Sequence, residues 1–263
     1  MASRQPAPMN LVTSIDLNCD LGEHDGGGYA DDSAILDIVT SANIACGAHA
    51  GSKEVMRSTI RAAMSRDVCI GAHPGYDDRS GFGRRETNAP LSAVRESLAS
   101  QLESMAECCA AEGAALRYVK PHGALYNRAA VDPQMAELIV TTVSAFDASL
   151  WLLALAGSAM ERAALQHDVN VAREAFIDRA YMADGTLVPR TMDGATLTDP
   201  DVAAARAVRF AREARVLTID NEDIEVHAES LCVHGDGATA RQTVDRARAE
   251  LRRAGIALRT FVR

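Results

Sequence analysis

Short runs of β-branched and apolar residues alternate with amphipathic helical patterns along almost the whole chain. We expect strands at Ile15–Asp20, Ala42–Gly47, Val68–His73, Leu116–His122, Leu150–Ala156, Asn170–Glu174, Ser230–Gly235 and Ile256–Val262. Helical patterns separate these strands; one has apolar residues at three- and four-residue spacing from Leu91 to Cys109 and ends at Gly113. Strands joined through helices are parallel, with right-handed crossovers, which restricts the fold to a β/α barrel or an open doubly wound sheet.

The length of 263 residues favours the closed form, because β/α barrels often contain about 250 residues in one domain. No G-x-G-x-x-G motif follows the first strand, which argues against the open sheet. We therefore predict a single α/β domain over residues 15–263, a TIM-like β/α barrel, after a disordered tail at residues 1–14. The runs Val216–Ile219 and Ile224–Val226 predict a small β-hairpin inserted before the seventh strand.

Charge and composition exclude several classes of partner. The formal net charge is −9, from 36 acidic and 27 basic side chains, so the surface repels nucleic acid and anionic lipid. We expect no nucleic-acid partner and no membrane partner. The first residues lack the apolar run of a secretory signal, so we expect a cytoplasmic protein. The six cysteines show no C-x-x-C spacing and are better explained as small buried hydrophobes than as a nucleophile.

Polar side chains gather at the carboxyl ends of the predicted strands. Asp16, Asn18 and Asp20 share one face of the first strand, because side chains alternate along a strand. The other strand ends and the turns after them supply His49, His73, Lys120, His122, Glu174, Asp178, Arg179, His234 and Asp236. Active sites of β/α barrels lie at this carboxyl-terminal rim. The sequence therefore predicts an active site built from several strand ends.

The residue types at the rim fit two kinds of chemistry. Histidines transfer protons near neutral pH, aspartates orient them, and a lysine in a dry environment stabilises negative charge. Asp20, His49 and His73 are also a candidate triad for a divalent metal such as zinc or manganese. No G-x-S-x-G elbow occurs, so a serine hydrolase is not expected, and no standard P-loop motif occurs either.

Two loops are candidates for substrate contacts. Gly75–Arg85 mixes glycine with three arginines and is either a solvated surface loop or an anion clamp at the rim. Asp178–Arg190 follows the sixth strand and is a candidate lid, with Arg190 as a partner for a carboxylate. The triple glycine Gly26–Gly28 after the first strand is equally consistent with a mobile rim loop and with a simple linker.

Eight motifs that occur in order along the chain resemble those of one known family. They are D-L-N-C-D-L-G-E, S-A-N-I-A-C-G-A-H-A-G, G-A-H-P-G-Y, G-F-G-R-R, V-K-P-H-G-A-L-Y-N, D-R-A-Y, D-G-T-L-V-P-R and C-V-H-G-D. On these motifs the chain resembles the LamB/YcsF family from Ile15 to the C-terminus. The resemblance implies a distorted barrel similar to those of the glycoside hydrolase/deacetylase superfamily. The chain departs from the family pattern at Ala48, where an aromatic residue is common, and around Gly26–Gly28.

The resemblance also implies an activity, the hydrolysis of the lactam 5-oxo-L-proline (pyroglutamate) to L-glutamate with ATP cleaved to ADP and phosphate. In such a 5-oxoprolinase, family members form one of three components and work with two partners, subunits B and C. Whether a divalent metal such as Mg²⁺ accompanies ATP is left open by the sequence. Strand-end placement and the family motifs together predict the catalytic residues Asp20, His49, His73, Lys120, His122, His234 and Asp236. They predict the substrate-binding residues Asp16, Asn18, Glu23, Glu174, Asp178, Arg179 and Arg190.

Two other functions remain as alternatives. The first is a metal-dependent deacetylase or amidohydrolase of the same barrel superfamily, with Asp20, His49 and His73 as metal ligands. The second is a non-catalytic scaffold for partner subunits. A scaffold has no need of buried charged groups, which are costly to remove from water, so the sequence favours an enzyme.

Overall fold

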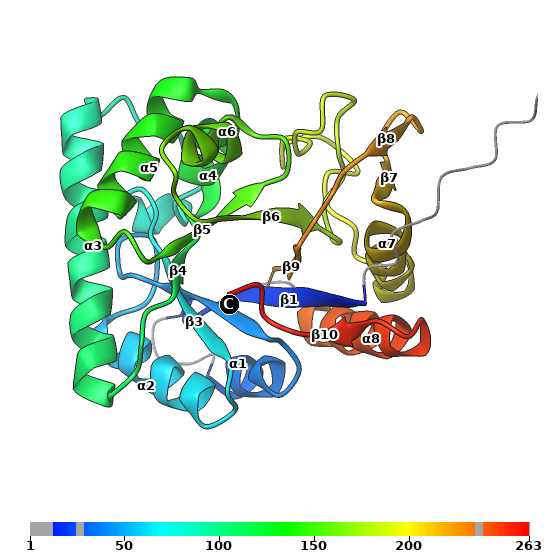
Figure 1. Ribbon diagram of the computed structural model, residues 1–263, viewed down its shortest axis with the longest axis horizontal. Coiled ribbons are helices and arrows are strands. Elements are labelled where there is room, and N and C mark those ends of the chain that lie inside the picture. The colour runs from blue at the N-terminus through cyan, green and yellow to red at the C-terminus, as the bar shows by residue number, and fades with distance from the viewer. Residues whose placement is uncertain (1–12, 25–28, 235–238, 263) are drawn as a thin grey trace, which may run out of the picture.

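The computed structural model describes residues 13–24, 29–234 and 239–262. Within them, seven parallel strands form a closed ring, because β9 pairs with both β6 and β1. In ring order these strands are β1 (Ser14–Leu21), β2 (Ser41–Ala45), β3 (Cys69–His73), β4 (Tyr118–Val119), β5 (Trp151–Leu155), β6 (Val171–Phe176) and β9 (Ser230–Val233). The TIM-like β/α barrel predicted from the sequence is confirmed (Figure 1). Residues 1–12 of the predicted tail lie outside the described residues.

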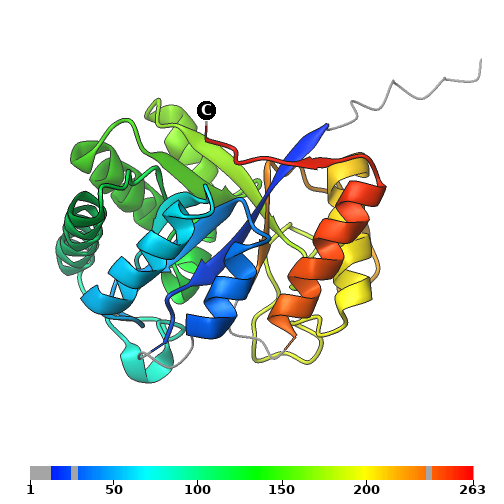
Figure 2. The ribbon, with the colours of Figure 1, turned by 90° about the horizontal axis from the view of Figure 1, so that it is seen from below.

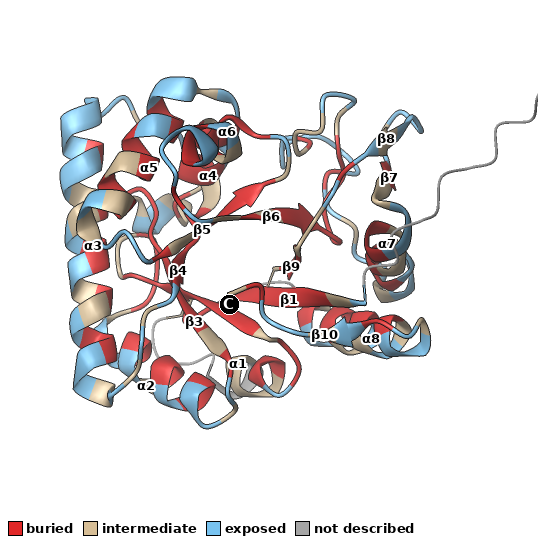
Figure 3. Ribbon diagram, viewed as in Figure 1, coloured by how far each residue is buried: buried red, intermediate tan, exposed pale blue. Residues whose placement is uncertain are grey.

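Helices surround the ring on its outer side (Figures 1 and 2). They are α1 (Tyr29–Leu36), α2 (Lys53–Met64), α3 (Leu91–Glu112), α4 (Gly123–Val131), α5 (Pro133–Phe146), α6 (Ala159–Gln166), α7 (Pro200–Glu213) and α8 (Ala240–Arg253), with a 3₁₀ turn η1 (Arg79–Gly81). Buried residues concentrate on the strands and on the helix faces that pack against them (Figure 3).

Helix ends lie where the sequence signals predict them. Gly113 caps α3 in a left-handed conformation with φ of 71°, which glycine adopts without a steric cost. The Asp132 carboxylate accepts a hydrogen bond from the backbone N–H of Gln134 at the start of α5, and Asp199 accepts one from Asp201 at the start of α7. Proline follows each capping aspartate, at a position where a missing N–H costs nothing.

The β-hairpin insertion is confirmed, and the last predicted strand takes an unexpected place. Strands β7 (Arg215–Leu217) and β8 (Asp223–Glu225) pair antiparallel before β9. Strand β10 (Ala257–Leu258) is only two residues long and pairs with Ser14 and Ile15, outside the ring. Since β2 pairs with β1 only from Asn18 onward, the first residues of β1 leave an edge that β10 occupies. The expectation of eight ring strands was therefore wrong by one.

Alternation along β1 divides its side chains between two environments. Leu17 and Cys19 belong to the large apolar core between the strands and the helices. Asn18 and Asp20 point the other way and hydrogen-bond to groups on other strands inside the ring. Because both faces are covered, the polar row of β1 lines the barrel interior rather than a solvated face, as the sequence predicts. This interior carries the functional groups described below.

One close contact inside the ring sets the position of a polar side chain. Gly71 on β3 lies directly against the ring of Tyr118 on β4, so that a Cβ atom at position 71 would lie 2.2 Å from two ring carbons. The Tyr118 hydroxyl donates a 2.6 Å hydrogen bond to Asn43 Oδ1. A side chain larger than hydrogen at position 71 would therefore displace both the ring and the hydrogen bond that orients Asn43.

We predict that Gly71→Ala lowers the free energy of unfolding by about 3 kcal/mol, because the added methyl group would overlap the buried Tyr118 ring. Gly113→Ala is the matched control, because nothing lies within 4 Å of its added Cβ. This variant should lose only about 1 kcal/mol, the cost of holding alanine in the left-handed conformation. Urea unfolding of both variants measures the difference. Equal destabilisation would show that the Gly71–Tyr118 contact is not tight.

Candidate active site

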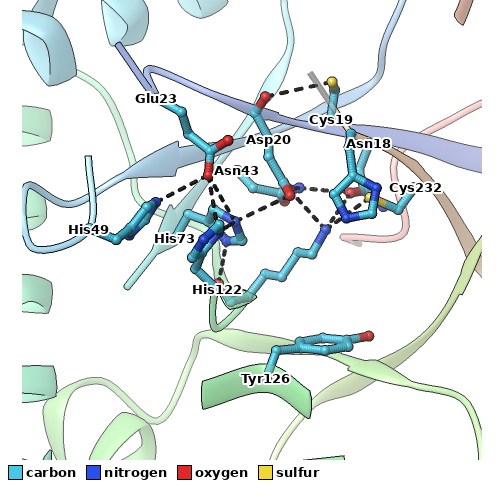
Figure 4. A network of polar contacts seen from close by, with 12 residues as sticks. Asn18, Cys19, Asp20, Glu23, Asn43, His49, His73, His122, Tyr126 and Cys232 are labelled. Atoms are coloured by element: carbon cyan, nitrogen blue, oxygen red, sulfur yellow. Dashed lines mark hydrogen bonds and ion pairs between the residues drawn. The ribbon is translucent and has the colours of Figure 1, made fainter. Parts of the chain in front are cut away.

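The carboxyl ends of the strands open into a cavity of about 490 Å³. Seven of the residues predicted from the sequence line it, from elements far apart in the chain: Asp20, His73, Lys120, His122, Arg179, Arg190 and His234. Tyr126, Phe176 and Arg84 line it as well. Figure 4 shows how the polar side chains of the strand ends face one another. The rim site expected from the strand-end pattern is thus a real concavity with ionisable walls.

Lys120 is the central cation of this site and is almost fully buried. Its Nζ lies 2.9 Å from Asp20 Oδ1 and 2.9 Å from Glu174 Oε1, and Asn18 and Cys232 also contact it. Burial by itself lowers the pKa of Lys120, but the attraction of Asp20, together with Cys232 and Glu174, raises that pKa well above its usual value. Lys120 therefore carries a fixed positive charge at neutral pH.

Lys120 and His122 reach the cavity because the chain continues beside β3 after β4 has ended. The N–H of Lys120 donates to Ala72 O at 2.9 Å, and the N–H of His122 donates to Pro74 O at 2.7 Å. Gly83 packs against the same histidine, and a Cβ atom there would lie 2.9 Å from His122 Cδ2. Its φ of 63° also favours glycine, which explains the second glycine of the G-F-G-R-R motif.

A second cluster beside Lys120 consists of Glu23, His49, His73 and His122. Glu23 Oε1 lies 3.0 Å from His122 Nδ1, 3.1 Å from His49 Nε2 and 3.8 Å from His73 Nε2. Burial raises the pKa of Glu23, but hydrogen bonds with His122 and His49 reverse this and hold it well below its usual range. Burial lowers the pKa of His49 to about 4, so its ring is neutral at neutral pH.

The potential ligand atoms of this cluster all lie within 4.8 Å of one another, so it has the size of a metal site. Its members differ from the triad expected from the sequence, since Glu23 and His122 belong to it and Asp20 does not. Asp20 is engaged elsewhere: its Oδ1 accepts hydrogen bonds from Lys120 and Asn43, and its Oδ2 lies 3.3 Å from His73 Nε2.

Asp178 and His234 form a pair, of which His234 lines the cavity. The Asp178 carboxylate lies 2.9 Å from His234 Nδ1 and also accepts the backbone N–H of His234 at 2.9 Å. Burial raises the pKa of Asp178, but the charge and hydrogen bonds of His234 lower it overall. Because Nδ1 donates to the carboxylate, the ring has its lone pair on Nε2 whenever it is neutral. His234 stacks on Phe176 with ring centroids 5.4 Å apart, which fixes the ring plane.

Positive charge accumulates on the outer wall. Arg179 donates to the carbonyl oxygens of Val188 (2.6 Å) and Ala195 (3.1 Å), which anchors the Asp178–Arg190 loop. Burial, followed by repulsion from Arg190, lowers the pKa of Arg179 to about 10, so it remains charged at neutral pH. Of the three arginines in the Gly75–Arg85 loop, only Arg84 lines this cavity; Arg85 pairs with Asp78.

The remaining predicted residues lie below or beside the cavity. Asn18 and Glu174 support Lys120 from the barrel interior, and the Tyr126 hydroxyl donates a 2.6 Å hydrogen bond to Glu174 Oε2. Asp16 lies deeper and accepts hydrogen bonds from Thr40, Ser41 and Ser230. Asp236 and Gly26–Gly28 lie outside the described residues. Ala48 lines a different cavity, with Gly47 and Arg79.

Three residues of the site were missed or undervalued at the level of sequence. Asn43 bridges Asn18 and Asp20, and its signal was a polar residue inside an otherwise apolar buried strand. Tyr126 lies one helical turn after His122, in the V-K-P-H-G-A-L-Y-N motif, and its hydroxyl reaches Glu174. Cys232 contacts Lys120, but burial raises the pKa of its thiol well above its usual value, which disfavours a nucleophilic role.

The model of the LamB/YcsF family matches residues 15–263. This chain belongs to the LamB/YcsF family. It is 47% identical over 248 residues to the protein from Symbiobacterium thermophilum that is named as the A subunit of 5-oxoprolinase, covering 94% of this chain and 95% of the relative. The protein of the same name from Heliobacterium modesticaldum is 44% identical over 93% of this chain and 97% of the relative.

A solved structure supports the LamB/YcsF assignment. The lactam utilization protein from Thermus thermophilus has a TM-score of 0.88 to this chain and 40% sequence identity, covering 94% of this chain and 100% of that one. The family match and the two relatives confirm the family membership predicted from the eight motifs. Among the described residues, no helix is both long and apolar enough to span a membrane.

Asp16 lies deep inside this LamB/YcsF barrel, and we expect the stability of the protein to depend on pH through its carboxyl group. Burial, opposed by hydrogen bonds from Ser230, Ser41 and Thr40, raises the pKa of Asp16 from 3.8 to about 6. The folded state therefore binds the proton more tightly than the unfolded state. The resulting stabilisation is complete below pH 3.8 and is lost as the pH rises through about 6.

We predict that the free energy of unfolding of the wild type, relative to that of Asp16→Asn, falls by up to about 3 kcal/mol between pH 4 and pH 7. Urea unfolding of both proteins across this range provides the measurement, and the comparison cancels the titration of other groups. A difference that is constant with pH would mean that Asp16 titrates at its ordinary pKa in the folded state.

Proposed function

We propose that this chain is the A subunit of an ATP-dependent 5-oxoprolinase, which opens the lactam of 5-oxo-L-proline to give L-glutamate. The observation that carries the proposal is the extensive identity, over nearly the whole chain, to two relatives that bear this name. The cavity supports it, because a wall with lysine and arginine suits an anionic substrate and the histidines suit proton transfer. The catalytic domain covers residues 15–263.

A five-membered lactam is an unstrained amide, so its opening requires activation. Phosphoryl transfer from ATP to the lactam oxygen would make the ring carbon electrophilic. Water then adds to that carbon, the ring C–N bond breaks as the nitrogen takes a proton, and an acyl phosphate remains. A second water molecule hydrolyses the acyl phosphate, releasing phosphate and glutamate. The protein must therefore bind anions, activate water and protonate a leaving nitrogen.

The cationic side of the cavity is the candidate site for anion binding. Arg179, Arg190 and Arg84 line it and repel one another enough to affect the pKa of Arg179, so an anion between them would be favoured. The substrate carboxylate and the transferred phosphoryl group are the two anions of this reaction. Lys120 lies deeper, already paired with Asp20 and Glu174, and supplies positive potential to oxygen atoms that become negative.

Water activation is best assigned to His234, with Asp178 as its positioning residue. The carboxylate holds the proton on Nδ1 and leaves Nε2 basic, as in other histidine–carboxylate pairs. Asp20 is a weaker candidate for the base. Burial raises its pKa, but the charges of His73 and Lys120 reverse this and hold it well below its usual range. His234, which then holds the proton taken from water, is also the candidate donor to the leaving nitrogen, since it lines the cavity and His49 does not.

We further propose that the partner subunits B and C supply much of the nucleotide site, because no standard P-loop motif occurs in this sequence. Mg²⁺ would accompany ATP, and the enzyme would act in the cytoplasm. The relatives' names do not favour a metal-dependent deacetylase. A scaffold role does not explain why Lys120, at the cavity, is buried in contact with two carboxylates, Asp20 and Glu174.

The test of this function is glutamate formation from 5-oxo-L-proline. The purified chain, alone and with co-expressed subunits B and C, is incubated with the lactam and with or without ATP, and glutamate and ADP are measured. We expect both products only with all components and ATP. No glutamate under any condition would overturn the proposal, and ATP-independent cleavage of amides by the chain alone would favour the deacetylase alternative.

In the active complex, we predict that His234→Gln lowers kcat by about 10²- to 10⁴-fold, the usual contribution of general base catalysis. Asp178→Asn should lower kcat as well and change its pH profile, because the ring would no longer be held with Nε2 as the base. His227→Gln, a change at an exposed histidine beside the hairpin, is the control and should have no effect. Activity of His234→Gln within twofold of the wild type would remove His234 from the mechanism.

A further inference from the structure

Two histidines at the cavity have the same unusual arrangement of partners. His73 Nδ1 lies 2.7 Å from the carbonyl oxygen of Lys120, and His122 Nε2 lies 2.8 Å from that of Phe82. A carbonyl oxygen only accepts, so each of these nitrogens carries the ring proton. In a neutral imidazole the second nitrogen then has a lone pair and no hydrogen. His73 Nε2 and His122 Nδ1 are these second nitrogens.

The two lone pairs face each other and also face carboxylate oxygens. His73 Nε2 lies 3.0 Å from His122 Nδ1, Glu23 Oε1 lies 3.0 Å from His122 Nδ1, and Asp20 Oδ2 lies 3.3 Å from His73 Nε2. These atoms are buried or nearly so, and as long as both rings are neutral no ring N–H lies among them. Electron-rich atoms so close together in a dry site repel one another unless a cation lies between them.

The orientations of the imidazole rings determine which of the histidines can bind the same cation. The rings of His73 and His122 are nearly perpendicular, at 89°, so both planes can contain a common point in front of the two nitrogens. The rings of His49 and His122 are parallel within 1° and stacked with centroids 3.8 Å apart. Stacked parallel planes share no point, and a metal ion lies in the plane of each imidazole that binds it. As arranged, His49 and His122 cannot both be ligands of one ion.

The spacing of Glu23 Oε1, His73 Nε2 and His122 Nδ1 fits a small divalent ion. With metal–ligand bonds of roughly 2.0–2.1 Å, neighbouring ligands of a tetrahedral ion are about 3.3–3.4 Å apart. The three separations among Glu23 Oε1, His73 Nε2 and His122 Nδ1 are 3.0, 3.0 and 3.8 Å, on either side of this value. The carbonyl partners of both histidines match the outer hydrogen bonds that orient metal-binding imidazoles.

We propose that Glu23, His73 and His122 bind a divalent metal ion, with zinc the best match to two imidazoles and one carboxylate, and that His49 positions Glu23. His49 Nε2 lies 3.1 Å from Glu23 Oε1 and, being neutral, can donate its proton there. Since His73 and His122 line the cavity, the fourth coordination position faces the cavity and is open to water or a substrate oxygen. The ion would lie in the cavity of the proposed function, but its binding does not depend on that function.

The test measures metal binding on the purified chain without lactam, ATP or partner subunits, so that its failure leaves the oxoprolinase proposal standing. The chain is stripped with a chelator, dialysed, and titrated with Zn²⁺ and, separately, with Co²⁺. We expect one ion per chain by elemental analysis and the intense visible absorption of four-coordinate Co²⁺. A wild-type chain that binds neither ion would overturn the proposal and leave a proton shared between the two histidines as the cation.

Variants separate this ligand set from the Asp20, His49 and His73 triad. His122→Gln should weaken Co²⁺ binding by about 100-fold or more and alter the spectrum. His49→Gln, which keeps an N–H donor for Glu23, should cost about tenfold and keep one ion with the same spectrum. His227→Gln controls for surface binding. If His122→Gln fails to fold by circular dichroism, Glu23→Gln takes its place. Loss of the ion in His49→Gln, but not in His122→Gln, would overturn the assignment.

Discussion

The interior of this barrel depends on one buried cation. The ammonium group of Lys120 lies 2.9 Å from carboxylates of β1 and β6, and the residue itself follows β4, so one side chain joins three parts of the ring. Removing one member of such a group leaves a buried charge without compensation, at a cost of about 3–5 kcal/mol. Asn18, Asn43 and Tyr126 hydrogen-bond to the same two carboxylates. The polar side chains around Lys120 thus form one connected network of hydrogen bonds and ion pairs.

This network has two levels with different chemistry. Near the amino ends of the strands, Asp16 is held by hydroxyl groups of β2, β9 and the turn before β2, and it is not among the residues that line the cavity. Near the carboxyl ends, the histidines and arginines border open space. The lower level is suited to stability and the upper to binding and proton transfer, and Lys120 lies between them. The same charge can therefore hold the ring together and supply potential to the site.

The sequence predicts only which residues lie at strand ends, and these ends converge at one rim of the barrel. In a parallel barrel all carboxyl ends meet at one rim, so the residues that end β1, β3 and β9 had to come near one another. Their partners could not be predicted, because a hydrogen bond depends on strand stagger and on the path of the chain after each strand. Glu23, for example, contacts His49 and His122, which no pattern in the sequence indicates. Tyr126 reaches Glu174 only because α4 begins directly after His122.

By itself, the sequence determined the alternation of strands and helices, the helix caps and the concentration of ionisable groups at strand ends, because these follow from local patterns of two or three to four residues. It also determined the family, through motifs spread over the whole chain. Tertiary structure decided that the ring closes through β9, that β10 stays outside it, and that Glu23 joins the histidines while Asp20 joins Lys120. These outcomes depend on distances between residues far apart in the chain, such as Asp16 and Ser230, which are separated by 214 positions. No local pattern encodes such distances.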